Sequence, residues 1–252
     1  MLFRELELNS QSIVTEIVKM DYRTAEVFQK YGIEYCCGAS WPIATVCLMN
    51  GIEENILLAD LKKATRTITL PSHLSFSDWA IDFLIDYIIH VYHQSLEKKL
   101  PAISTSIIDF TVEHGKQYPY MALLQKQFEK FQRDCLLHIQ YEEEVIFPYL
   151  RHVAHAFEKK EAFAQQLVRT LRKPIAKTIE QDAAIFQNHI NTFRELTNGY
   201  TTPHKTCTNH SVVFSKLKEI EQDLAQHIYL ENDVLFPRII EMEKVLLDND
   251  IV

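Results

Sequence analysis

The pattern of hydrophobic and polar residues predicts helices along almost the whole chain. Apolar side chains recur three and four residues apart, the spacing that places them on one face of an α-helix. No run of alternating β-branched residues competes with this pattern. The predicted helices cover 10–31 (as two short helices), 52–65, 77–100, 101–115, 119–151, 160–198 and 208–246. The sequence therefore predicts an all-α protein.

Breaks between these helices indicate the domain organisation. A stretch containing Thr, Pro and Ser (TRTITLPSHLSFS, 65–77) has the composition of a linker, and Pro101 predicts a helix end further along the chain. Four of the later segments are long enough for a helical bundle, with 101–115 as an extra short helix. We expect a small N-terminal helical domain (1–65), a linker (66–76) and an antiparallel four-helix bundle (77–246).

One eleven-residue string occurs twice in the predicted bundle. The first copy is HIQYEEEVIFP at 138–148 and the second is HIYLENDVLFP at 227–237, with six of the eleven positions identical. A lone His-x-x-x-Glu spacing carries little weight. The repeated string indicates two helices that do the same job in a pseudo-symmetric bundle.

Each copy places polar residues on the core-facing stripe of its helix. His138 and Glu142 take two apolar positions of one stripe, His227 and Glu231 take two of the other, and His93 interrupts the stripe of the 77–100 helix. Burying an unpaired carboxylate or imidazole costs several kcal/mol. These groups could simply hydrogen-bond to one another in pairs. Two matching copies and a third histidine at similar depth favour a metal site.

The donor set narrows the choice of metal. Three imidazoles and two carboxylates exceed what one tetrahedral zinc needs, and this mixture in a bundle core is typical of iron or manganese in pairs. The carboxylates are natural bridges because each has two oxygens, and the imidazoles are natural terminal ligands. Spacing alone does not choose iron over manganese. Glu143 lies about 100° around the helix from Glu142 and is expected to be solvated.

Composition and charge limit the partners and the cellular compartment that we expect for this protein. The 252 residues carry 26 basic and 34 acidic side chains, and this net charge of −8 argues against binding nucleic acid or anionic membranes. The sequence shows neither a signal peptide nor an apolar run long enough to span a bilayer, so we expect a cytoplasmic protein. In a reducing compartment its five cysteines are thiols, ligands or redox groups rather than a disulfide framework.

Two of the cysteines, Cys36 and Cys37, are adjacent in the string YGIEYCCGAS. Adjacent cysteines rarely pair with each other, because the resulting ring is strained. In an exposed loop they would suit redox exchange or binding of iron or nitrosyl-iron, whereas in a buried one they would be small apolar residues. The residues alone leave both interpretations open. The other three are Cys135, expected to pack in the core, and Cys47 and Cys207, which carry no signal.

The string YGIEYCCG in a short helical domain, followed by a bundle with His-x-x-x-Glu twice, resembles the iron-sulfur cluster repair di-iron proteins. The resemblance covers essentially the whole chain. It implies a hemerythrin-like bundle with two carboxylate-bridged irons, in a cytoplasmic protein that acts under oxidative and nitrosative stress. Such proteins help to restore damaged iron-sulfur proteins, which would be the clients, by supplying iron. Nitric oxide reduction has also been proposed for them, and members are described as dimers.

The resemblance assigns roles residue by residue. It assigns the metal ligands to the five core-facing polar residues, His93, His138, Glu142, His227 and Glu231. It assigns redox chemistry or iron transfer to the adjacent thiols, Cys36 and Cys37.

A sixth ligand of the family is missing. The family usually has a histidine on the third bundle helix, in a Met-Glu-x-Glu-His type string, and the matching string here is IEQDA, which ends at Ala183. The stripe of that helix places Ala183 toward the core. Glu180, His90 or a water molecule are the alternatives for this position. Asp182 and His189 are expected to point away from it.

Other classes of function stay open beside iron donation. A sensor that binds oxygen or nitric oxide reversibly would need an open coordination position and firmly held iron. A nitric oxide reductase would need an electron source, and a bundle with a decayed site would hold no metal. The favoured interpretation is a di-iron protein that repairs clusters by giving up iron.

Overall fold

The computed structural model describes residues 7–36, 40–66, 74–161, 163–173, 175–203 and 207–248. Helices dominate these ranges, and within them the only β-type pairing is an isolated bridge between Ile13 and Pro42. The all-α prediction is confirmed. The chain divides into two compact units, one of residues 1–73 with 197–218 and one of residues 74–196 with 219–252. Most of the expected linker lies outside the described residues.

The N-terminal unit packs four short helices and the beginning of a fifth. These are α1 (Val14–Met20), α2 (Thr24–Lys30), α3 (Ile43–Asn50), α4 (Glu54–Thr65) and the first turns of α11 (Thr208–Tyr229). Their core is made by apolar side chains including Val14, Ile17, Phe28, Leu57 and Val212. The chain turns after α2 at Gly32, whose φ of +66° is a conformation that glycine adopts at little cost. The sequence did not predict α3.

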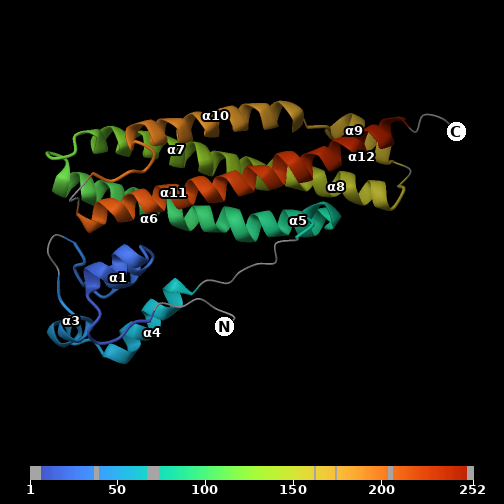
Figure 1. The fold of residues 1–252 in the computed structure, drawn as a ribbon. Coiled ribbons are helices and arrows are strands. Elements are labelled where there is room, and N and C mark those ends of the chain that lie inside the picture. Colours follow the sequence, from blue (N-terminus) through green and yellow to red (C-terminus); the bar gives the residue numbers. More distant parts are fainter. Residues whose placement is uncertain are drawn as a thin grey trace. The chain divides into compact units, whose positions relative to one another are not determined.

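The second unit is built mainly from long helices that lie side by side (Figure 1). The first runs through α5 (Ile81–Tyr87), η2 (Ile88–His93) and α6 (Gln94–His114), and the second through α7 (Tyr120–Tyr141), η3 (Glu142–Ile146) and α8 (Phe147–Glu158). A third continues from α11 through η4 (Leu230–Leu235) into α12 (Phe236–Asp248). The remaining elements are a short 3₁₀ turn, η1 (Phe76–Asp78), with α9 (Ala164–Leu171) and α10 (Ile175–Leu196).

Each of the three interrupted helices contains a π-helical turn, namely η2, η3 and η4. Such turns accommodate one extra residue and occur frequently at functional sites. In the second and third helices a Phe-Pro pair, with Pro148 or Pro237, follows the turn directly. Proline lacks a backbone N–H, so it is tolerated where the helical hydrogen-bond register changes. The repeated eleven-residue string therefore marks a repeated π turn as well as repeated polar side chains.

Two predicted helix boundaries were wrong. Pro101 does not end a helix, because α6 runs through it from Gln94 to His114. Pro101 is exposed, and Leu100, Ile103 and Ile107 keep the buried stripe continuous on the other face.

The expected helix over 160–198 is instead two helices, α9 and α10. The chain leaves the helical conformation at Arg172, and Lys173 precedes a proline, a position that disfavours helix. None of the helices that the structure describes combines the length and apolarity that crossing a membrane requires.

Candidate metal centre

The five polar residues of the predicted stripes meet in the second unit. His93 ends η2, His138 and His227 lie in the last turns of α7 and α11, and Glu142 and Glu231 lie in η3 and η4. All five are buried, with exposed fractions of 0% for His93, Glu142 and His227, 2% for Glu231 and 8% for His138. Each interrupted helix thus brings one or two polar side chains, in or just before its π turn, to the same level of the core.

The ligating atoms of these residues converge closely. His93 Nε2 lies 3.0 Å from His227 Nε2 and 3.4 Å from Glu142 Oε2. His138 Nε2 lies 3.3 Å from the same Glu142 oxygen, and His227 Nε2 lies 2.5 Å from Glu231 Oε1. One ligand atom from each of His93, Glu142, His227 and Glu231 falls in a cluster whose members all lie within 4.8 Å of one another.

Two further carboxylates orient the histidines from outside. His93 Nδ1 lies 2.8 Å from Glu143 Oε1, and His138 Nδ1 lies 3.1 Å from Asp182 Oδ2. When Nδ1–H donates to a carboxylate, the Nε2 lone pair is left pointing into the cluster, as in carboxylate–histidine–metal arrangements. The Glu143 side chain is 36% exposed, so it is partly solvated as expected, but its carboxylate also reaches His93. The expectation that Asp182 points away from the site was wrong. Both expectations were based on the angle around the helix, but both side chains are long enough to reach an imidazole.

The cluster has polar atoms without hydrogen-bond partners. Among the described residues, buried side-chain atoms lacking any such partner are His138 Nε2, both Glu142 carboxylate oxygens, His227 Nδ1 and Glu231 Oε1. Glu231 Oε1 does lie 2.5 Å from His227 Nε2, as an ion pair with that imidazole. Buried polar groups in proteins are normally satisfied. Lone pairs and carboxylates that face one another favour a cation between them, and this donor set fits a metal ion.

The two buried carboxylates raise the pKa values of neighbouring groups, which means that the cluster favours positive charge. Burial alone lowers the pKa of an imidazole, but Glu142 and Glu231 outweigh it and raise the pKa of His93 to about 10. Burial is likewise outweighed at His138, mainly by the charge of Glu142, and its pKa rises to about 9. Burial and the neighbouring Glu231 raise the pKa of Glu142 to about 8. The pKa of Glu231 is lowered despite burial, because His227 lies against it.

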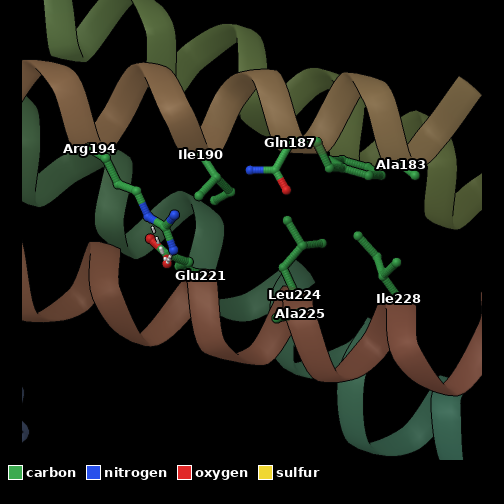
Figure 2. Close-up of a pocket in the computed structure, with 9 residues that line it drawn as sticks. Ala183, Gln187, Ile190, Arg194, Glu221, Leu224, Ala225 and Ile228 are labelled. Carbon is green, nitrogen blue, oxygen red and sulfur yellow. Dashed lines mark hydrogen bonds and ion pairs between the residues drawn. The ribbon is translucent and has the colours of Figure 1, made fainter. Parts of the chain in front are cut away.

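The position that the resemblance assigns to the family's sixth ligand borders a pocket. Ala183 is partly exposed and lines an opening of about 230 Å³ between α10 and α11. Figure 2 shows Ala183 at one end of this pocket and the ion pair of Arg194 with Glu221 at the other. Phe186 forms part of its wall, and the Phe186 ring centroid also lies 5.1 Å from that of His138. Phe186 therefore lines the pocket and also packs against His138 of the polar cluster.

Of the proposed substitutes for the sixth ligand, His90 is engaged elsewhere. His90 is exposed and its Nδ1 lies 2.9 Å from Gln94 Nε2. His189 is buried but lies 2.9 Å from Asp134 Oδ2, away from the cluster. The side chain of Glu180 lies outside the described residues. A water at this position stays a prediction.

The structure adds one cysteine that sequence reasoning passed over. Cys36 Sγ lies 2.8 Å from Cys207 Sγ within the N-terminal unit, whereas Cys37 lies outside the described residues. Cys207 stands far from the double-Cys string in sequence, and nothing in its surroundings marks it. Cys135 is wholly buried, and burial raises the pKa of its thiol to about 12, which suits a packing role.

The fold and the cluster define a class of protein, and comparison with known families identifies it. The chain belongs to the hemerythrin HHE cation-binding domain family, whose model matches residues 84–239. A second family model, ScdA_N, described as a domain of unknown function (DUF542), matches residues 10–65. These two matches confirm the hemerythrin-like bundle and the separate double-Cys region that the resemblance implied.

Several relatives resemble the chain over nearly its full length. The iron-sulfur cluster repair protein ScdA of Staphylococcus epidermidis is 27% identical over 92% of this chain and 99% of its own. A probable iron-sulfur cluster repair protein of Haemophilus influenzae is 25% identical over 92% of this chain and 97% of its own. The iron-sulfur cluster repair protein YtfE of Escherichia coli is 24% identical over 88% of this chain and 93% of its own. The resemblance to the cluster repair family is confirmed.

Proposed function

We propose that this protein holds two irons in its bundle and donates iron to iron-sulfur clusters damaged by oxidative or nitrosative stress. The observation that carries the proposal is the buried cluster of three imidazoles and two carboxylates, with polar atoms that lack hydrogen-bond partners. The names and the full-length coverage of the relatives support the biological role. Bound ferrous iron would supply the exchangeable metal that a damaged cluster has lost.

Each residue of the cluster has a definable part in holding the metal. His93, His138 and His227 would be terminal ligands through Nε2. Glu142 and Glu231 would bridge the two irons, because each carboxylate offers two oxygens and both lie at the centre of the cluster. Without a metal, each carboxylate lies close to the imidazoles around it. These contacts would hold the ligand side chains in place for a cation.

The surroundings of the site suit release as well as binding. Ala183 supplies no ligating atom at the family's histidine position, and the pocket beside it gives small molecules an approach to the wall formed by Phe186. An iron with fewer protein ligands is held less tightly. Cys36 and Cys37 would handle iron or electrons during transfer. The clients would be damaged iron-sulfur proteins in the cytoplasm, and the repair protein would act as a homodimer.

The same pocket supports the alternative that the site binds oxygen or nitric oxide, as a sensor or a nitric oxide reductase. A small diatomic ligand needs an open coordination position, which the missing sixth ligand would provide. The alternative differs from donation in what happens to the iron, because a sensor or reductase must keep it.

Iron content and iron transfer, measured in parallel, test the proposal. Protein purified without metal, given ferrous iron anaerobically and freed of excess should hold about two irons per chain by elemental analysis. Glu142→Gln should lose most of this iron. Glu144→Gln, an exposed neighbour in the same turn, should retain it. The loaded wild-type protein should restore a peroxide-damaged iron-sulfur enzyme, and Glu142→Gln should not.

Two results would contradict the proposal. Equal iron content in Glu142→Gln and Glu144→Gln would show that the buried cluster is not the metal site. Firm retention of iron together with many turnovers of nitric oxide consumption, given an electron donor, would replace donation with the reductase function.

A further inference from the structure

Cys36 and Cys207 form a pair of thiols outside the metal cluster. They are 171 residues apart in sequence, yet their sulfur atoms lie 2.8 Å apart, and both side chains are half-buried. Both belong to the N-terminal unit, which includes residues 197–218. The comparisons and the metal site give Cys207 no role.

Several independent contacts fix the two segments against each other. Val212 is 2% exposed and forms part of the core of the N-terminal helices. Next to Cys36, the Tyr35 hydroxyl donates to Asn209 Oδ1 at 3.3 Å. Lys216 Nζ pairs with Glu26 Oε1 at 3.1 Å, and Lys216 is itself buried. The approach of the two sulfurs is therefore a consequence of how the unit packs.

We propose that Cys36 and Cys207 are a thiol–disulfide redox pair, oxidised by peroxides and reduced again by dithiols. A disulfide bond is about 2.05 Å long, so the two sulfurs need to approach by only about 0.7 Å. The adjacent Cys37 is a poorer partner for Cys36 because a ring closed by neighbouring residues is strained. Cys207 directly precedes α11, and the positive end of a helix favours the thiolate that attacks an oxidant.

The oxidation balances with hydrogen peroxide as the only co-reactant. One thiolate attacks a peroxide oxygen, the O–O bond breaks, and a sulfenic acid and hydroxide form. The second thiol then attacks the sulfenic sulfur, the S–S bond forms, and the hydroxyl leaves as water. Two thiols and one hydrogen peroxide give one disulfide and two waters, with two electrons passing from sulfur to oxygen. A dithiol reverses the bond by exchange and becomes a disulfide itself.

Oxidation would change what the N-terminal unit can do. The disulfide would join the loop after α2 covalently to the start of α11. It would also withdraw the Cys36 thiol from any reaction with iron. This inference does not rest on the proposed function, because the thiol pair can be measured in protein without iron.

Peptide mapping of the full chain tests the pair. After treatment with hydrogen peroxide, digestion without reductant should yield a peptide that links Cys36 to Cys207, and dithiothreitol should remove it. Cys36→Ser and Cys207→Ser should each abolish the link. Cys37→Ser is the matched control and should retain it. Titration of the wild-type link in dithiothreitol redox buffers should follow a single two-electron transition.

The result can also go against the pair. Loss of the link in Cys37→Ser with its retention in Cys36→Ser would assign the reaction to Cys37. Peroxide treatment that leaves both wild-type thiols available to maleimide would overturn the proposal, and this measurement needs no variant. Iron content has no part in either outcome, so failure of the metal proposal would leave this test intact.

Discussion

At the scale of single residues, two carboxylates outside the metal cluster control how its histidines present their nitrogens. Glu143 holds Nδ1 of His93, and Asp182 holds Nδ1 of His138. Each contact leaves Nε2 directed inward. The two acids therefore tune the site without contributing an atom to it.

Replacing Glu143 with Gln should weaken iron binding by about 10- to 100-fold, the usual effect of losing a carboxylate behind a ligating histidine. An amide has no charge to hold the imidazole in the required tautomer. Competition with a chromophoric ferrous chelator under anaerobic conditions would measure the affinity. Glu144→Gln makes the same chemical change at the next residue, whose side chain is exposed to solvent, and is the control. Equal affinities for the two variants would assign Glu143 to the surface.

Ala183→His should slow the release of iron to a chelator and to an apo cluster protein. The added imidazole would stand at the family's ligand position, and the neighbouring pocket has space for a larger side chain. Rates measured side by side with the wild-type protein would check this expectation. Unchanged or faster release, with lower stability, would mean that the new side chain crowds the helix packing instead.

At the scale of helices, sequence patterns predicted the elements well where one face is buried and poorly elsewhere. The stripes that contain His138 and His227 located the long helices and the polar residues that converge. The α3 helix was missed because IATVCLMN has apolar residues all round, with Leu48 and Met49 exposed. The π turns were missed because apolar residues spaced three and four apart fit an α-helix, and this spacing does not reveal the one extra residue of a π turn. Cys207 was missed because pairing across 171 residues leaves no local pattern.

Pro101→Ala should stabilise the protein by about 1 to 3 kcal/mol. Proline inside a helix removes one backbone hydrogen bond and crowds the preceding turn, at a cost of about 3 kcal/mol relative to alanine. Here α6 continues through Pro101, and the side chain is exposed, so alanine leaves no cavity. Urea unfolding of the metal-free protein would give the difference. A lower free energy of unfolding in the variant would show that Pro101 is better suited to this helix than its geometry suggests.

At the scale of the whole molecule, the buried polar cluster links metal binding to stability. A ferrous ion that binds the folded site and not the unfolded chain should stabilise the fold by about 2.7 kcal/mol at an iron concentration of 100 times Kd. Thermal unfolding under anaerobic conditions should show a higher Tm with iron than without. Glu142→Gln should lose this shift. A Tm that does not respond to iron in the wild-type protein would argue against binding in the core.

The N-terminal unit has a further consequence for the order in which the molecule is made. Val212, Asn209 and Lys216 complete this unit, although they are synthesised well after its four short helices. At about 5 to 20 residues per second, translation from residue 73 to residue 197 takes roughly 6 to 25 s. During that interval the nascent helices lack part of their core and expose apolar surface on the ribosome.

A fragment of residues 1–73 should therefore be less stable than the same residues in the full chain. Hydrogen exchange at Val14 and Ile17, which are fully buried, would report on this core. Equal protection in the fragment and the full chain would show that the late segment is dispensable. The first residues of the unit are synthesised early and its last residues late. We therefore expect the unit to complete its folding only after most of the bundle has been synthesised. A chaperone that binds nascent chains would then bind the exposed apolar side chains of the N-terminal helices.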